Sequence, residues 1–165
     1  MQRTIKMLLL NIVRWTAMAA ALAFPIQFAK SEPVNEYSNF THKDLYCLTK
    51  NIYHEARGES YLGKLAVAQV TLNRLNHPTK WPSTMCDVVY QKIRGVGQFS
   101  WTTMQNLKVV DTQAWYEARQ IAHGILTGDL WIKNFNHTHF HNTSVQHGQK
   151  RKNHRIIGNH VFYQN

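Results

Sequence analysis

Apolar residues recur at helical spacing in three segments after residue 40. Thr41 and Asp44 are typical of a helix start, and the helix predicted there ends near Gly58. Its apolar positions lie three or four residues apart, at Leu45, Leu48, Ile52 and Ala56. We expect Ser60 to cap a second helix that runs to Asn73 and is buried on several faces. We expect Asp111 to cap a third helix that ends at Gly128, and Ser83 to cap a short helix that ends near Tyr90.

The pattern changes near the end of the chain. Histidines alternate at positions 137, 139 and 141, which predicts a strand, and a basic loop at 149–153 leads to a second strand within 156–163. Residues 94–102 contain glycines and aromatics and are expected to form a loop with extended segments. The fold class predicted is α+β, mostly helical, with a small C-terminal β-hairpin.

Residues 1–30 differ from the remainder of the chain. A basic start and an apolar run are typical of a secretory signal peptide. Arg14 interrupts the run, which disfavours a permanent transmembrane helix, but an uncleaved signal anchor contacting the membrane through residues 7–29 is an open alternative. We therefore expect an exported protein of the cell envelope, with a linker at 31–40 and one catalytic domain at 41–165.

The charge composition of the chain indicates which kind of molecule it binds. The 165 residues include 19 Lys and Arg against 9 Asp and Glu, a net charge of +10, and 44% hydrophobic residues provide a core. The positive charge suits an anionic polymer such as the cell wall, because an exported chain would rarely meet nucleic acid. Cys47 and Cys86 are too few for a four-cysteine zinc site, but they could pair in an oxidising compartment.

Carboxylates offer the first candidate chemistry. Glycosidic cleavage needs a carboxylic acid whose pKa is raised by apolar surroundings, and the residues around Glu55 are apolar. Glu55 and Glu59 are four residues apart. The alternative is that the two form a like-charge pair on a solvated helix face.

Histidines and a glycine-bounded aromatic segment offer two further candidates. Three histidines on one face of a strand, joined by His160, could bind zinc, although they could equally line a sugar-binding groove. In 98–101, an amide, a hydroxyl and aromatic rings could bind a sugar, or the rings could belong to the core.

Several ordered motifs resemble the spore cortex-lytic (SleB-type) cell-wall hydrolases. The resemblance extends from Leu45 to the end of the chain, roughly three quarters of its length. The matching segments are Asn51–Glu59 (NIYHEARGE), Gly63–Val70 (GKLAVAQV), Leu72–Arg74, Trp81–Pro82, Cys86–Gln91, Gln98–Trp101 (QFSW), His139–His141 and Ile157–Tyr163 (IGNHVFY).

The resemblance implies a lysozyme-like domain that cleaves peptidoglycan without metal or cofactor, usually as a lytic transglycosylase. Glu55 would be the catalytic acid and base. It would protonate the oxygen leaving N-acetylmuramic acid and then take the proton of that sugar's C6 hydroxyl, closing a 1,6-anhydro ring. The substrate-binding residues implied are Glu59, Gln98, Phe99, Ser100, His139 and His141, with Glu59 organising the turn or groove. A muramidase that activates water and a non-catalytic peptidoglycan-binding protein are the alternatives.

This sequence departs from the family pattern after Trp101. Exported relatives often have another Cys there, whereas Thr102 follows in this chain, so Cys47 and Cys86 are its only two cysteines.

Overall fold

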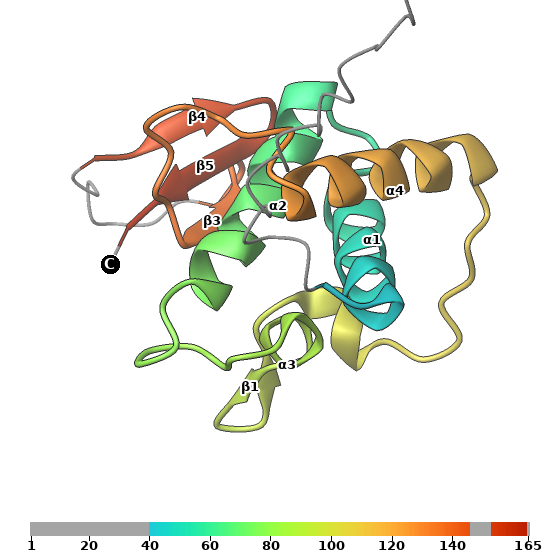
Figure 1. Ribbon diagram of the computed structural model, residues 1–165, viewed down its shortest axis with the longest axis horizontal. Coiled ribbons are helices and arrows are strands. Elements are labelled where there is room, and N and C mark those ends of the chain that lie inside the picture. Colours follow the sequence, from blue (N-terminus) through green and yellow to red (C-terminus); the bar gives the residue numbers. More distant parts are fainter. Residues whose placement is uncertain (1–39, 146–152, 165) are drawn as a thin grey trace, which may run out of the picture. The chain divides into compact units, whose positions relative to one another are not determined.

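The computed structural model describes residues 40–145 and 153–164, all within the unit Val34–Asn165 (Figure 1). The expected signal segment 1–30, its membrane-contacting part 7–29 and residues 31–39 of the expected linker lie outside the described residues. Within the described ranges, no helix is long and apolar enough to cross a membrane. The prediction of a mostly helical α+β fold is confirmed.

The three long helices begin where the sequence predicts, because their caps are local. The main helices are α1 (His42–Ala56), α2 (Tyr61–Leu75) and α4 (Thr112–Leu126). Thr41 forms a capping box with Asp44, while the Ser60 and Asp111 side chains accept hydrogen bonds from the first turns of α2 and α4.

The short helix α3 (Met85–Val89) begins one residue later than expected. Its cap is Thr84 and not Ser83. The Thr84 hydroxyl accepts from the Asp87 backbone N–H and donates to the Asp87 carboxylate at 2.7 Å. If Ser83 were the cap, the residue three positions later would be Cys86, which has no carboxylate to accept a hydrogen bond from the cap.

Helix α2 lies between the other long helices and the larger sheet (Figure 1). One core packs α2 against α1, α3 and α4, with Leu48, Ile52 and Ile121 fully buried. A second core joins α2 to the sheet through Val67, Val70, Phe135, Ile157 and Phe162. The burial of α2 on opposite faces explains why its apolar residues are not confined to one stripe.

The larger sheet has one strand more than the sequence predicts. Its strands are β3 (His139–Asn142), β4 (Arg155–Ile157) and β5 (His160–Tyr163), in the antiparallel order β3-β5-β4. The stretch expected as one strand within 156–163 is divided at Gly158, whose φ of 58° reverses the chain. β4 and β5 therefore form the hairpin, and β3 pairs with the other edge of β5.

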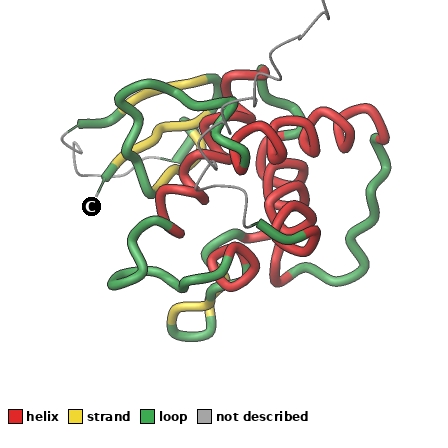
Figure 2. The backbone as a smooth tube through the Cα atoms, in the orientation of Figure 1, coloured by secondary structure: helices red, strands yellow, loops and turns green. Residues whose placement is uncertain are grey.

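The region 94–102, expected as a loop with extended segments, includes the second strand of a short hairpin and most of a 3-10 helix. β1 (Lys92–Ile93) pairs with β2 (Val96–Gly97) in a small hairpin separate from the larger sheet (Figure 2). The 3-10 helix η2 (Ser100–Thr103) follows. A disulfide joins Cys47 of α1 to Cys86 of α3, with their Cα atoms 5.3 Å apart.

Polar side chains of α2 hold the segment that leads into β3. The Gln69 amide donates to the carbonyls of Ile132 and Phe135 and accepts from the Ile132 N–H at 2.6 Å. Asn73 donates to the carbonyls of Phe135 and His137 at 3.0 and 2.8 Å. These bonds satisfy backbone groups of a loop that has no strand partner, and they fix where β3 begins.

Candidate active site

Glu55 lies in the last turn of α1 and lines a cavity of about 370 Å³. The lining residues come from α1, α2, the 98–100 segment and the larger sheet: Glu55, Arg74, Gln98, Phe99, Ser100, Phe140, His141, Asn142 and His160. Burial raises the pKa of Glu55 to about 7, although the nearby Arg74 guanidinium acts to lower it. At neutral pH a large share of this carboxyl therefore carries a proton.

A buried amide one turn before Glu55 joins three elements of the site. The Asn51 side chain donates to the Thr71 hydroxyl of α2 and accepts from the Trp101 indole N–H of η2, both at 3.0 Å. His54 stacks on the same indole with ring centroids 4.7 Å apart. These contacts hold the 98–101 segment beside the end of α1, which is where Glu55 lies.

Arg74 places a cation in the wall of the cavity. Its side chain is only 4% exposed, its Nε donates to the Thr138 carbonyl at 2.7 Å, and its guanidinium lies over the rings of Trp81 and Phe99. Burial lowers the pKa of Arg74 to about 10, so the guanidinium remains charged at neutral pH. Its Nη1 is buried and has no hydrogen-bond partner among the described residues.

The structure brings five of the seven predicted site residues to one cavity: Glu55, Gln98, Phe99, Ser100 and His141. Phe99 is 2% exposed and belongs largely to the core, where it packs against Phe140. The other two residues, Glu59 and His139, lie outside the lining. His139 stacks on Tyr163 with the rings 14° from parallel and also contacts the Trp81 ring.

The histidines considered as zinc ligands face different surroundings. His137 packs on the Phe135 ring, with its Nε2 3.2 Å from the Asn153 carbonyl oxygen, while His141 and His160 line the cavity. Among the described residues, no group of three His, Cys, Asp or Glu side chains is arranged to hold a metal ion.

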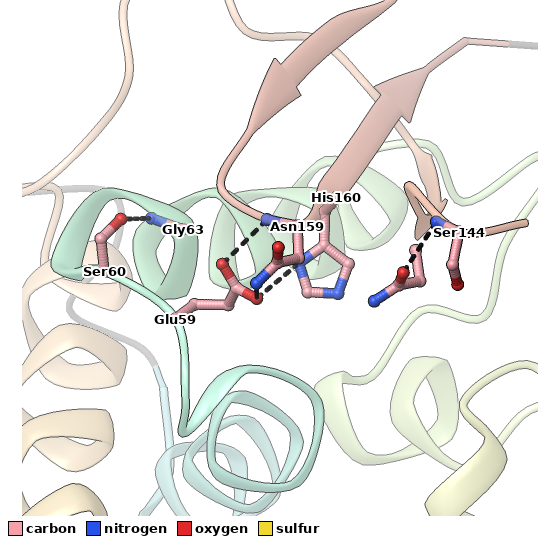
Figure 3. Close-up of polar contacts among 7 residues, drawn as sticks. Glu59, Ser60, Gly63, Ser144, Asn159 and His160 are labelled. Carbon is pink, nitrogen blue, oxygen red and sulfur yellow. Dashed lines mark hydrogen bonds and ion pairs between the residues drawn. The ribbon is translucent and has the colours of Figure 1, made fainter.

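Glu59 connects the turn after α1 to the turn between β4 and β5. Its carboxylate accepts hydrogen bonds from the backbone N–H and the side-chain amide of Asn159, at 3.1 and 3.0 Å (Figure 3). A Cβ added to Gly158 would collide with the same carboxylate. On the other side, Glu59 Oε1 lies 4.0 Å from Nδ1 of His160.

The sequence patterns assign no role to Arg74, Phe140 or Asn142, and they give His160 as a candidate for zinc binding or for a sugar-binding groove. The sequence did contain one indication for Arg74, because a charged residue in a helix that is predicted to be buried needs a specific environment. It contained no signal for Phe140 or Asn142, because their places in the cavity depend on the pairing of β3 with β5.

The sequence of this chain matches a protein-family model and is similar to known enzymes. A family model described as cell wall hydrolase matches residues 58–163, a range that begins just after Glu55. The spore cortex-lytic enzyme of Bacillus subtilis is 37% identical over 71 residues, which are 42% of this chain and 23% of that protein. The corresponding enzyme of Halalkalibacterium halodurans is 39% identical over 59 residues, 36% of this chain and 18% of that protein. The chain thus spans about a fifth of the length of these relatives.

Two solved structures share the fold. The catalytic domain of the Bacillus cereus SleB protein has a TM-score of 0.57 and 23% identity, covering 81% of this chain and 99% of that one. The SleB catalytic domain from Bacillus anthracis, a germination-specific lytic transglycosylase, has a TM-score of 0.54 and 23% identity, covering 77% and 98% of the two chains. The larger sheet and the helices therefore form a known catalytic-domain fold.

Proposed function

Since the chain belongs to the cell wall hydrolase family, we propose that it cleaves the glycan strands of peptidoglycan. The bond cleaved lies between N-acetylmuramic acid and N-acetylglucosamine. The observation that carries this proposal is a mostly buried Glu55 with a pKa of about 7 in the wall of a polar cavity. A carboxyl group in this state can protonate the oxygen of a leaving sugar at neutral pH.

The lining of the cavity supports a transglycosylase in preference to a hydrolase with two carboxylates. Among the described residues that line it, Glu55 is the only acid, and Glu59 is engaged by Asn159. One carboxyl suffices when the attacking group belongs to the substrate itself. Glu55 gives its proton to the leaving oxygen, and the resulting carboxylate then takes the proton of the C6 hydroxyl as the 1,6-anhydro ring closes.

Arg74 supplies charge stabilisation in this scheme. When Glu55 has given up its proton, the charge of the nearby Arg74 guanidinium favours the carboxylate and so offsets part of the cost of its burial. Gln98, Ser100 and His141 would contact the sugar through polar groups. Glu59 would act by shaping the turn beside the cavity.

The proposal is tested by measuring whether a variant with Glu55 replaced still releases soluble fragments from purified peptidoglycan, which clears the suspension. The variant Glu55→Gln should release no soluble fragments from purified peptidoglycan while its unfolding transition stays intact. Asp129→Asn is the matched control, because Asp129 is an exposed carboxylate after α4. Undiminished clearing by Glu55→Gln would remove Glu55 from the catalytic role, and wall binding without release by the wild type would indicate a non-catalytic binding protein.

We also propose that the protein is exported to the cell envelope, because peptidoglycan lies outside the cytoplasm. The basic and apolar segment 1–30 would direct export, with residues 7–29 contacting the membrane before cleavage or as an anchor. Cell fractionation would test this: recovery of the protein in the cytoplasm alone would contradict it.

A further inference from the structure

His160 is a second ionisable side chain in the wall of the cavity, and it faces a carboxylate on its far side. The residue is only 6% exposed, and its ring meets Phe140 edge to face, with centroids 5.0 Å apart. Its Nδ1 is buried without a hydrogen bond and lies 4.0 Å from Glu59 Oε1. Because Nδ1 is buried, Nε2 is the ring nitrogen left to face the cavity that His160 lines.

Glu59 is held firmly in this position. Two hydrogen bonds from Asn159 fix both carboxylate oxygens, and the carboxylate occupies the space that a side chain at Gly158 would need. The two hydrogen bonds and the contact with His160 connect residues about 100 positions apart in the chain. The negative charge of a fixed carboxylate 4.0 Å from one ring nitrogen favours the tautomer that has its proton on that nitrogen.

A neutral imidazole has one N–H donor and one acceptor nitrogen. The Glu59 carboxylate favours the proton on Nδ1, which leaves a lone pair on Nε2. We propose that His160 binds substrate by accepting, at Nε2, a hydrogen bond from a hydroxyl or acetamido N–H of the bound sugar, with Glu59 as its positioning residue. This inference rests on the proposed function, since it takes the ligand of the cavity to be an N-acetylated glycan.

The charged and titratable neighbours of His160 agree with a neutral ring. Burial lowers the pKa of His160, the Glu59 carboxylate raises it, and His141 on the adjacent strand lowers it. The desolvation effect is the largest, so the pKa of His160 lies below its ordinary value and the neutral form of the ring is favoured.

Two matched substitutions distinguish substrate binding from a structural role. A Gln side chain reaches about as far as Nε2 of histidine, whereas the shorter Asn side chain reaches about as far as Nδ1. The assay is calorimetric titration of a tetrasaccharide of alternating N-acetylglucosamine and N-acetylmuramic acid into proteins that also carry Glu55→Gln, so that no cleavage occurs. We expect His160→Ala and His160→Asn to weaken binding about tenfold, and His160→Gln to retain most of the affinity.

The opposite result, in which His160→Asn retains the affinity for the tetrasaccharide and His160→Gln loses it, would mean that His160 acts only through Nδ1 and Glu59. That result would overturn the proposal. Equal affinity in all three variants would overturn it as well. Thermal unfolding of each variant identifies any that fails to fold, and the remaining Gln or Asn variant still gives the comparison.

A second measurement needs no substrate. Long-range ¹H–¹⁵N NMR correlations of the labelled wild-type protein should show His160 with its proton on Nδ1. In Glu59→Gln the preference should weaken and the His160 pKa should fall further, because the carboxylate that raises it is gone. Unchanged His160 signals in Glu59→Gln would refute the positioning role. If the wild type cleaves no glycan, the proposed function fails, whereas the NMR result on Glu59 and His160 stands by itself.

Discussion

Replacing Glu55 with Gln should change how stability depends on pH, in addition to abolishing catalysis. The substitution keeps nearly the same side-chain volume and removes the ionisable group. Burial raises the pKa of Glu55 from 4.5 to about 7, and Arg74 acts in the opposite direction. Because the unfolded chain has the ordinary value, the folded wild type binds this proton more tightly than the unfolded chain does.

The size of the effect follows from the two pKa values. A carboxyl with a raised pKa stabilises the fold fully at pH values below 4.5, and that contribution is lost as the pH rises through about 7. Each pH unit between the two values is worth about 1.4 kcal/mol. The free energy of unfolding of the wild type, minus that of Glu55→Gln, should therefore fall by about 3 kcal/mol between about pH 4 and about pH 8.

Urea denaturation of both proteins at a series of pH values measures this difference directly. All other titrating groups are common to the two proteins and cancel in the subtraction, and Asp129→Asn provides the same comparison for an exposed carboxylate. Two stability curves that stay parallel across this pH range would refute the conclusion that Glu55 is buried with a raised pKa.

Three further predictions concern the pH dependence of activity, the disulfide and the glycine next to Glu59. Glycan cleavage should fall as the pH rises above about 7, because Glu55 loses the proton it must donate; a rate that stays constant well above that pH would exclude this carboxyl as the acid. Replacing Cys47 and Cys86 with Ser should lower the free energy of unfolding by about 4 kcal/mol, from the entropy of a loop spanning 39 positions, and chemical denaturation measures it. Gly158→Ala should lower stability by more than about 1 kcal/mol and reduce activity, since φ is 58° and the methyl group would collide with Glu59; a thermal unfolding curve like the wild type's would contradict this.

The parts of the fold that local chemistry determines could be predicted from the sequence. A helix start depends on a side chain and a backbone N–H two or three residues away, so Thr41, Ser60 and Asp111 identify their helices without knowledge of the fold. Where two candidate caps are adjacent, as at Ser83 and Thr84, the position of Asp87 decides between them. That detail is also present in the sequence.

The third strand and the full lining of the cavity could not be predicted in this way. Gly158 divides β4 from β5 where Glu59, about 100 residues earlier, approaches the backbone. The places of Arg74 and His160 beside Glu55 likewise depend on packing between α2 and the sheet. Periodicity describes one segment at a time and contains no information on such pairings.

The end groups of the released fragments test the central claim most directly. Wild-type protein should be incubated with purified peptidoglycan, and the soluble products analysed by mass spectrometry, with folded Glu55→Gln as the control. We predict N-acetylmuramic acid residues with 1,6-anhydro ends, one water lighter than reducing ends, from the wild type and none from Glu55→Gln. Reducing ends alone would show that water is the attacking group, and anhydro products from Glu55→Gln would show that another residue donates the proton.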